Sequence, residues 1–329
     1  MTKRALILGI SGQDGAYLAH LLHRKGYVLH GSSRRAGPES YANLERLGLR
    51  DRVTIHSVDL GVSASLRALL SEAAPDEIYH LAGQSSVGVS FAQPEETFAS
   101  IAGSTQRLLE ELRLAKSGAR VFNVASSECY GQCDVPADER TAFRPRSPYA
   151  AARASAFYTA SVYRESYGMF VATGIVANHE SPLRGRQFVT RKIVQAAVRA
   201  ANGENASLDL GNITVKRDWG WAPEFVEAFW RVLQSDRPQD YNIATGETNA
   251  LADFVQEIYA AAGLDWQKYV KTDNSLVRPS EFEATRIDAS KIKRELGWEA
   301  RYKMRDVARL LIRRERDGGL GPFAGELEI

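Results

Sequence analysis

The stretch Gly9-Ile-Ser-Gly12-Gln-Asp-Gly15, which directly follows the apolar run Ala5-Leu-Ile-Leu8, decides the fold. The apolar run predicts a first strand, Arg4–Leu8, and the glycines predict a tight turn into a helix over residues 15–25. Such a turn brings a pyrophosphate onto the N–H groups at a helix N-terminus. The spacing is G-x-x-G-x-x-G. Its place between a strand and a helix favours a dinucleotide site over an ordinary strand–helix turn.

Short β-rich runs then alternate with helical patterns, as they do in parallel βαβ units. We therefore expect an α/β fold with a doubly wound, Rossmann-like parallel sheet. The further strands are predicted at residues 27–32, 53–58, 77–81, 120–125, 171–178 and 240–244. The further helices are predicted at residues 63–73, 97–114, 147–167, 189–202, 223–234 and 250–262.

The alternation becomes less regular after Asn178, which suggests two domains. We expect residues 1–178 and 213–246 to form the cofactor-binding Rossmann domain. Residues 179–212 and 247–329 should form a smaller, C-terminal substrate domain. It would lie over the carboxyl ends of the strands, where open α/β sheets bind their ligands.

Composition narrows the class of protein. The 329 residues are 44% hydrophobic and 25% charged, with a net charge of +2, which is typical of a soluble chain. The charge gives no argument for nucleic acid or an anionic membrane, and no apolar run approaches the ~20 residues of a membrane span. The two cysteines, Cys129 and Cys133, lack a histidine cluster, so we expect no metal and a reduced, cytoplasmic protein.

The end of the second predicted strand bears on cofactor choice. An acidic residue there would bind the ribose 2′-hydroxyl of NAD, whereas arginine accommodates the 2′-phosphate of NADP. The sequence is Ser32-Ser-Arg34-Arg35, which predicts NADP, the alternative being two solvated surface arginines. The candidate cofactor-binding residues in these strand-end loops are Gly9, Gly12, Gln13, Asp14, Gly15, Arg34, Arg35, Asp59, Leu60, Leu81, Gly83 and Ser85.

Tyr149-Ala-Ala-Ala-Arg153 is the candidate for proton transfer. Four-residue spacing puts a phenol and a cation one helical turn apart, and a nearby cation stabilises phenolate. Such a tyrosine can take an alcohol proton while a hydride leaves. Ser126-Ser-Glu128 follows the strand at 120–125 and should open onto the same crevice. Glu128 suggests a second proton transfer, at carbon; the alternative is a helix-capping or salt-bridged glutamate.

Several longer stretches carry a resemblance that covers nearly the whole chain. The chain resembles the extended short-chain dehydrogenases/reductases and, within them, the GDP-mannose 4,6-dehydratases. The matching stretches are Gly9-Ile-Ser-Gly-Gln-Asp-Gly15-Ala-Tyr-Leu18, Arg34-Arg35, Arg146-Ser-Pro-Tyr149-Ala-Ala-Ala, Tyr163-Arg-Glu165, Asn178-His-Glu-Ser-Pro182, Arg184-Gly185, Phe188-Val-Thr-Arg-Lys192, Leu210-Gly-Asn212, Lys216-Arg-Asp-Trp-Gly220 and Arg278-Pro279 with Glu281.

The resemblance implies conversion of GDP-D-mannose to GDP-4-keto-6-deoxy-D-mannose, by hydride transfer from C4 to NADP and back to C6 with loss of water. It implies that Tyr149 is the base at O4 and that Glu128 acts at C5. Ser126 stands for a family threonine that hydrogen-bonds O4. Arg153 stands for a lysine that contacts the nicotinamide ribose.

Further roles follow from the same resemblance. Tyr149, Arg153, His179 and Arg184 join the cofactor-binding set. The substrate-binding residues would be Ser86, Asn178, Val189, Lys192, Gly211, Arg217, Arg278 and Glu281. Arg217 is expected to pair bidentately with the diphosphate. A homodimer or homotetramer is expected.

Two departures from the family pattern leave alternatives open. Arg153 replaces the usual lysine, and Gly83 replaces the usual alanine, which leaves extra space near the cofactor. Arginine keeps the charge but is longer, planar and always protonated. We therefore expect Arg153→Lys to raise turnover. The alternatives are another NADP-dependent GDP-hexose reductase or epimerase, and a weakly active homologue that binds nucleotide sugars.

Overall fold

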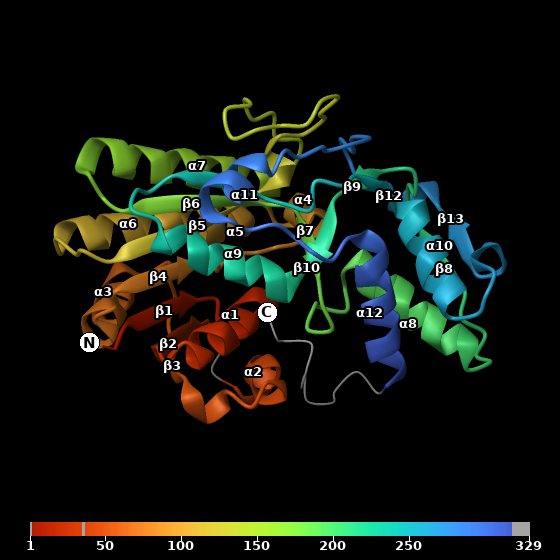
Figure 1. The fold of residues 1–329 in the computed structure, drawn as a ribbon, viewed down its shortest axis with the longest axis horizontal. Coiled ribbons are helices and arrows are strands. Elements are labelled where there is room, and N and C mark those ends of the chain that lie inside the picture. Colours follow the sequence, from red (N-terminus) through yellow and green to blue (C-terminus); the bar gives the residue numbers. More distant parts are fainter. Residues whose placement is uncertain (1, 35–36, 318–329) are drawn as a thin grey trace.

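The computed structural model describes residues 2–34 and 37–317, and its centre is a seven-stranded parallel sheet (Figure 1). The strand order is β11-β6-β5-β4-β1-β2-β3. The chain runs outward from β1 to β3 and then crosses back to β4, which makes β1 and β4 the switch point where such sheets bind ligands. The bounds are β1 (Arg4–Leu8), β2 (Val28–Ser33), β3 (Thr54–Ser57), β4 (Glu77–His80), β5 (Arg120–Ser126), β6 (Val171–Val176) and β11 (Asp240–Ile243).

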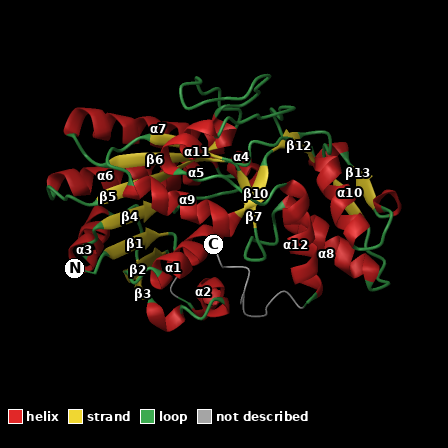
Figure 2. Ribbon diagram, viewed as in Figure 1, coloured by secondary structure: helices red, strands yellow, loops and turns green. Residues whose placement is uncertain are grey.

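Helices cover both faces of this sheet (Figure 2). One face packs against α1 (Gln13–Arg24) and α9 (Ala222–Gln234), and Phe122 of β5 stacks on Phe229 of α9 with 4.7 Å between ring centroids. The other face carries α3 (Ser63–Ala73), α6 (Ser104–Leu114) and α7 (Pro148–Tyr167). Because helices cover both faces, most residues of β1, β4, β5 and β6 are buried.

A smaller group of elements lies beyond the carboxyl ends of the strands, at the right of Figure 1. Here α8 (Val189–Ala201), α10 (Leu251–Ala261) and α12 (Met304–Arg316) pack on one another, next to a pair of strands, β8 (Leu208–Leu210) and β13 (Val270–Thr272). Its core contains Trp219 and Trp221.

Short elements connect the sheet to this group. The strand pairs are β7 (Asn178–Glu180) with β10 (Trp219–Trp221), and β9 (Lys216–Arg217) with β12 (Asn249–Ala250). The remaining helices are α2 (Ala42–Arg46), α4 (Val87–Ala92), α5 (Pro94–Phe98) and α11 (Ser290–Leu296). Within residues 2–34 and 37–317, no helix combines the length and apolar character that crossing a membrane requires.

Two predicted elements are divided in the structure. The helix expected over residues 97–114 is α5, a π-helical segment at Ala99–Gly103, and α6. The strand expected over residues 171–178 ends at Val176, and β7 begins at Asn178. The predicted strand is divided because β6 pairs within the main sheet, whereas β7 leaves that sheet and pairs with β10.

The segment around α11 packs on the sheet although it follows most of the smaller group in sequence. Ile287, Ile292 and Trp298 belong to the same apolar core as Phe225 of α9. The Trp298 ring meets the Phe225 ring edge-on at a centroid distance of 5.6 Å. This part of residues 247–329 therefore packs with the sheet and not with the smaller group.

Candidate active site

Tyr149 and Arg153 lie together in the first turns of α7. The helix starts with Ser147, whose Oγ accepts a hydrogen bond from the Ala150 N–H at 3.1 Å, followed by Pro148 at the first helical position. Tyr149 and Arg153 are both buried, and the Arg153 guanidinium carbon lies 5.6 Å from the centroid of the tyrosine ring. The structure therefore brings together the phenol and the cation that the spacing predicts.

The guanidinium of Arg153 is anchored on the sheet. Its Nη1 donates to the Val124 carbonyl of β5 at 2.9 Å, and the residue is only 4% exposed. Its Nη2 lies 3.6 Å from where a Cβ on Gly83 would stand, and Gly83 has a φ of +121°, which disfavours any side chain. Gly83 therefore leaves space beside the arginine side chain itself. Arg153 Nε is buried without a hydrogen-bond partner in the described chain.

The Arg153 charge also acts on His80 of β4. Burial first, and then the nearby Arg153 cation, lowers the pKa of His80 to about 3. Its Nε2 lies 3.2 Å from the Ser104 Oγ. His80 is therefore neutral near physiological pH. The positive charge beside Tyr149 is supplied by Arg153 and not by His80.

Glu128 follows β5 in a short 3₁₀ turn, Ser127–Cys129. The Ser126 Oγ accepts a hydrogen bond from the Glu128 N–H at 3.3 Å and so starts this turn. The Glu128 side chain is buried, and its Oε1 accepts a hydrogen bond from Arg217 Nε at 3.0 Å. The salt bridge considered as an alternative for Glu128 thus exists, and its partner is the arginine expected at the diphosphate.

A pocket above Glu128 collects several predicted substrate residues. Glu128, Arg217, Arg278 and Glu281 all line it, and the Glu281 Oε2 is buried without a hydrogen-bond partner among the described residues. The other lining residues, to which no role was assigned from the sequence, are Val87, Phe91, Arg146, Ser147, Pro279, Ser280 and Phe282. Arg146, Ser147 and Pro279 lie in stretches that carry the family resemblance, and this was the available signal.

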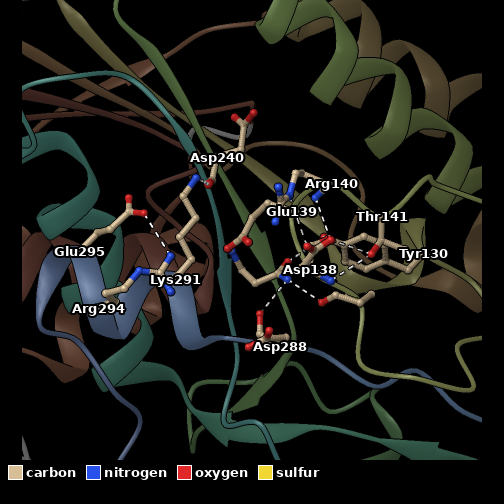
Figure 3. A network of polar contacts seen from close by, with 12 residues as sticks. Tyr130, Asp138, Glu139, Arg140, Thr141, Asp240, Asp288, Lys291, Arg294 and Glu295 are labelled. Carbon is tan, nitrogen blue, oxygen red and sulfur yellow. Dashed lines mark hydrogen bonds and ion pairs between the residues drawn. The ribbon is translucent and has the colours of Figure 1, made fainter.

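The loop that joins Glu128 to Tyr149 is fixed on strand β11 by a polar network (Figure 3). The Tyr130 hydroxyl lies 2.8 Å from Asn242 Oδ1 and 3.0 Å from the Asp138 carbonyl oxygen. The Asn242 side-chain amide donates to the carbonyls of Ala137 and Asp288, each at 2.9 Å. These contacts attach the loop at Tyr130 and at Ala137 to strand β11.

The glycine-rich turn has the shape that a pyrophosphate requires. Gly9 has a φ of +92°, and a Cβ there would lie 2.9 Å from the Ala82 backbone nitrogen. A Cβ on Gly15 would collide with the Gly9 carbonyl oxygen. Gly12 caps α1 without any side-chain hydrogen bond, so the first N–H groups of α1 suit an anion. These residues fit a dinucleotide.

A buried polar cluster joins this turn to β7. His179 Nε2 lies 3.0 Å from Asp14 Oδ1, and its Nδ1 lies 2.8 Å from the Ala177 carbonyl oxygen. Both partners can only accept, so both ring nitrogens must donate and His179 is an imidazolium. Burial opposes this charge, but the Asp14 carboxylate outweighs burial and raises the pKa of His179. The Gln13 amide donates to the His179 carbonyl at 3.1 Å.

The other predicted cofactor residues lie at strand ends. Arg34 follows β2, and its Nη1 is hydrogen-bonded to the Glu96 carboxylate of α5, with both side chains at least half exposed. Arg35 lies outside the described residues. Asp59 accepts a hydrogen bond from the Gly61 N–H at 2.7 Å. Leu60, Leu81 and Ser85 lie in the same set of strand-end loops.

The remaining candidates do not line the pocket beside Glu128. Arg184 stacks on Phe188, with its guanidinium carbon 3.8 Å from the ring centroid. Ser86 is the N-cap of α4, and Asn178 lies on β7. In the smaller group, Val189 and the exposed Lys192 lie on α8, and Gly211 lies close to the Leu276 backbone.

Sequence comparison finds relatives that match nearly the whole chain. A family model described as GDP-mannose 4,6 dehydratase matches residues 6–311. GDP-mannose 4,6 dehydratase 1 of Arabidopsis thaliana is 39% identical over 320 residues, covering 94% of this chain and 89% of the plant protein. GDP-mannose 4,6-dehydratase of Sinorhizobium fredii is 39% identical over 338 residues, covering 95% and 96% of the two chains.

Solved structures show the same fold at lower identity. A dTDP-glucose 4,6-dehydratase double mutant from Streptomyces venezuelae, solved with NAD, superposes with a TM-score of 0.84 at 24% identity, covering 96% of this chain and 98% of that one. The protein RMD of Pseudomonas aeruginosa, solved with NADPH, superposes with a TM-score of 0.76 at 22% identity, covering 95% and 99%.

Proposed function

The chain belongs to the GDP-mannose 4,6-dehydratase family, and we propose that it converts GDP-D-mannose to GDP-4-keto-6-deoxy-D-mannose as an NADP-dependent hydro-lyase. The observation that carries this proposal is the placement of a second proton-transfer group, Glu128, at the end of β5, whose Val124 carbonyl anchors Arg153 beside Tyr149. Simple oxidation at C4 needs one base, whereas loss of water across C5 and C6 needs another.

The chain's own residues divide the proton transfers between them. The Arg153 charge stabilises Tyr149 as a phenolate, this phenolate accepts the O4 proton, and Ser126 hydrogen-bonds O4. A bound NADP would accept the C4 hydride and return it to C6. The 4-ketone makes the C5 proton acidic, so Glu128 can remove it. Glu128 then returns this proton to the departing C6 hydroxyl, which leaves as water. Return of the hydride to C6 requires a proton at C5, and the proton that Tyr149 took from O4 balances this step.

NADP is proposed over NAD because the end of β2 offers Arg34 and no carboxylate. Arg34 pairs with Glu96 at the surface, and exposed pairs of this kind contribute only ~0–1 kcal/mol, so a 2′-phosphate can compete for the guanidinium. The dissociation constants of NADP and NAD, measured for wild type and Arg34→Ala, test this choice. We expect wild type to favour NADP and Arg34→Ala to lose that preference; equal binding of both by wild type contradicts it.

The function itself is tested by incubating the protein with GDP-mannose and NADP and identifying the product by NMR. We expect a 4-keto-6-deoxy sugar nucleotide and no net NADPH, because the hydride returns to the sugar. Net NADPH, or a GDP-hexose that differs only at C4, would point to the reductase or epimerase alternative.

We place the enzyme in the cytoplasm because its two cysteines, which lack a metal-binding pattern, fit a reduced protein. From the family resemblance we expect a homodimer or homotetramer. Light scattering at several protein concentrations would determine the oligomeric state, and a monomer at all of them would contradict this expectation.

A further inference from the structure

We propose that Asp218 is a positioning residue, which fixes Arg217 in the substrate pocket by holding the turn at Thr245 and Gly246. The inference rests on the proposed function, because Arg217 lines the pocket beside Glu128 and is the residue expected at the substrate diphosphate. No role was assigned to Asp218 from the sequence, although it lies within a stretch that carries the family resemblance.

The Asp218 carboxylate accepts one hydrogen bond at each of its oxygens from the backbone of this turn. The Thr245 N–H donates to Oδ1 at 3.1 Å, and the Gly246 N–H donates to Oδ2 at 2.8 Å. Gly246 has a φ of +79°, a left-handed conformation that favours glycine. Hydrogen bonds to a carboxylate are roughly twice as strong as those between neutral groups. Because each oxygen has its own donor, the carboxylate holds the turn in one orientation.

Burial and a lysine strengthen this contact. Asp218 is only 4% exposed, so water has little access to the two hydrogen bonds. Burial raises the pKa of Asp218 to about 6, and the N–H groups of the turn and the Lys303 cation oppose the rise. Asp218 is therefore a carboxylate above this pH. Lys303 also holds the turn directly, because its Nζ donates to the Thr245 carbonyl at 2.6 Å.

The turn leads from the sheet to the strand beside Arg217. The chain leaves β11, passes through the turn and returns as β12, which pairs with β9 and places Asn249 opposite Arg217. Ala244 lies in the core of the sheet, whereas Trp219 lies in the core of the smaller group. The hydrogen bonds of Asp218 therefore connect the two cores directly beside the arginine.

The guanidinium of Arg217 has close neighbours, so a small displacement of β9 matters. Its Nε donates to Glu128 Oε1 at 3.0 Å, and its central carbon lies 4.1 Å from the centroid of the Phe282 ring. Misplacing a group of the site by about 1 Å can cost ~10²-fold in rate. A displacement of this size would disturb the contact with Glu128 and weaken the binding of a diphosphate.

The test compares Asp218→Asn with wild type, each as the full chain. Asparagine keeps the shape of aspartate but directs an NH₂ group at one of the two N–H donors, so one hydrogen bond is lost. We expect the Kd of GDP, measured by titration calorimetry, to rise at least ~10-fold, which is about 1.4 kcal/mol. The KM of GDP-mannose in steady-state kinetics should rise in parallel.

Cofactor affinity distinguishes a local effect on Arg217 from a general loosening of the fold. We expect the Kd of NADPH to change by less than ~3-fold, because other contacts hold the glycine-rich turn, among them the Asp14–His179 pair. Asp209→Asn, at an exposed position of β8, is the matched control and should bind GDP as wild type does.

Lys303→Met carries the test if thermal unfolding shows that Asp218→Asn does not fold. Lys303 acts on the same turn, so its substitution should raise the Kd of GDP by at least ~3-fold. If both single variants fold, their effects on the free energy of GDP binding should be less than additive in the double variant, because both act through one turn.

The outcomes distinguish the positioning role from the proposed function. A higher Kd of GDP with the Kd of NADPH retained supports the positioning role. A Kd of GDP within ~3-fold of wild type in every folded variant overturns it, and so does an equal loss of affinity for GDP and NADPH. If wild type binds GDP but forms no 4-keto-6-deoxy product, the proposed function fails, and the affinities still decide the role of Asp218. Failure of wild type to bind GDP contradicts both.

Discussion

Arg153 keeps a positive charge beside Tyr149, the proposed catalytic base, but one of its N–H groups donates to the sheet. The resemblance implies a lysine that reaches the nicotinamide ribose from this position. In this chain, Nη1 donates to the Val124 carbonyl instead, and Gly83 leaves room for the planar group. Arg153 therefore keeps the positive charge of the family lysine. A contact with the nicotinamide ribose would have to come from the N–H groups of Arg153 that do not bind the Val124 carbonyl.

Substitutions of Arg153 should distinguish the effect of its charge on turnover from the effect of its shape. Arg153→Lys frees the cation from β5, so we expect kcat to rise. Arg153→Met keeps similar length without charge and should lower kcat by ~10²-fold or more, because Tyr149 loses its stabilised phenolate. Steady-state kinetics with saturating NADP measure both. If Arg153→Lys abolishes activity, arginine has a dedicated role, and the account of this residue is wrong.

The limits of sequence interpretation are also visible at single residues. Tyr149 and Arg153 could be paired from their spacing alone, because one helical turn separates them. Glu128 and Arg217 are 89 positions apart, and no local pattern predicts their hydrogen bond. Both had been assigned to the site, but the contact between them depends on how β9 packs against the end of β5.

At the scale of elements, β7 links the cofactor turn to the smaller group. Asp14 and His179 form a buried ion pair between α1 and β7, with Arg184 as a further nearby charge. The ring of His179 is stacked on Phe225 at 5.0 Å and meets Phe229 edge-on at 6.4 Å. The pair therefore fixes the glycine-rich turn relative to the strand that carries Asn178.

This pair should make stability depend on pH in a defined direction. The pKa of His179 is raised from 6.5, so its contribution is complete below pH 6.5 and is lost as the pH rises through the raised value. Burial opposes ionisation of Asp14, but His179 outweighs it and lowers the pKa of Asp14 from 3.8. That contribution is complete above pH 3.8 and is lost as the pH falls through the lowered value.

Denaturant unfolding at a series of pH values checks this prediction. Between pH 3.8 and 6.5, we expect His179→Gln to lower the free energy of unfolding by ~3–5 kcal/mol, since it leaves a buried carboxylate unpaired. The difference from wild type should shrink at alkaline pH. His23→Gln, at an exposed position of α1, is the control. If the free energy of unfolding of His179→Gln differs from that of wild type by the same amount at every pH, His179 does not act as a cation.

Elements of the sheet could be predicted well because their residues follow a simple pattern. The strand at Arg4–Leu8 and the helix at Ser63–Ala73 have the predicted bounds. The prediction of one helix over residues 97–114 was too simple, since a segment near its start, Ala99–Gly103, is π-helical. The two-residue strands β9 and β12 carry no periodic signal, because pairing with distant partners creates them.

At the scale of the whole molecule, packing suggests a different assignment of residues to domains. Residues 287–300 share the apolar core of the sheet, whereas α10 and α12 share the core of the smaller group. We propose that the Rossmann domain includes 1–178, 222–246 and the segment around α11, because Val215, Trp219 and Trp221 lie in the core of the smaller group. The sequence could not show this, because an apolar residue fits either core equally well until the chain path is known.

The most direct test of the account follows one hydrogen atom through the reaction. GDP-mannose that carries deuterium at C4 is converted in the presence of NADP, and the product is analysed by NMR and mass spectrometry. Internal hydride return predicts that the deuterium is recovered at C6 of the 4-keto-6-deoxy sugar. Its loss to solvent, or its accumulation on free reduced cofactor, would contradict the central claim that this chain couples oxidation at C4 to dehydration and reduction at C6.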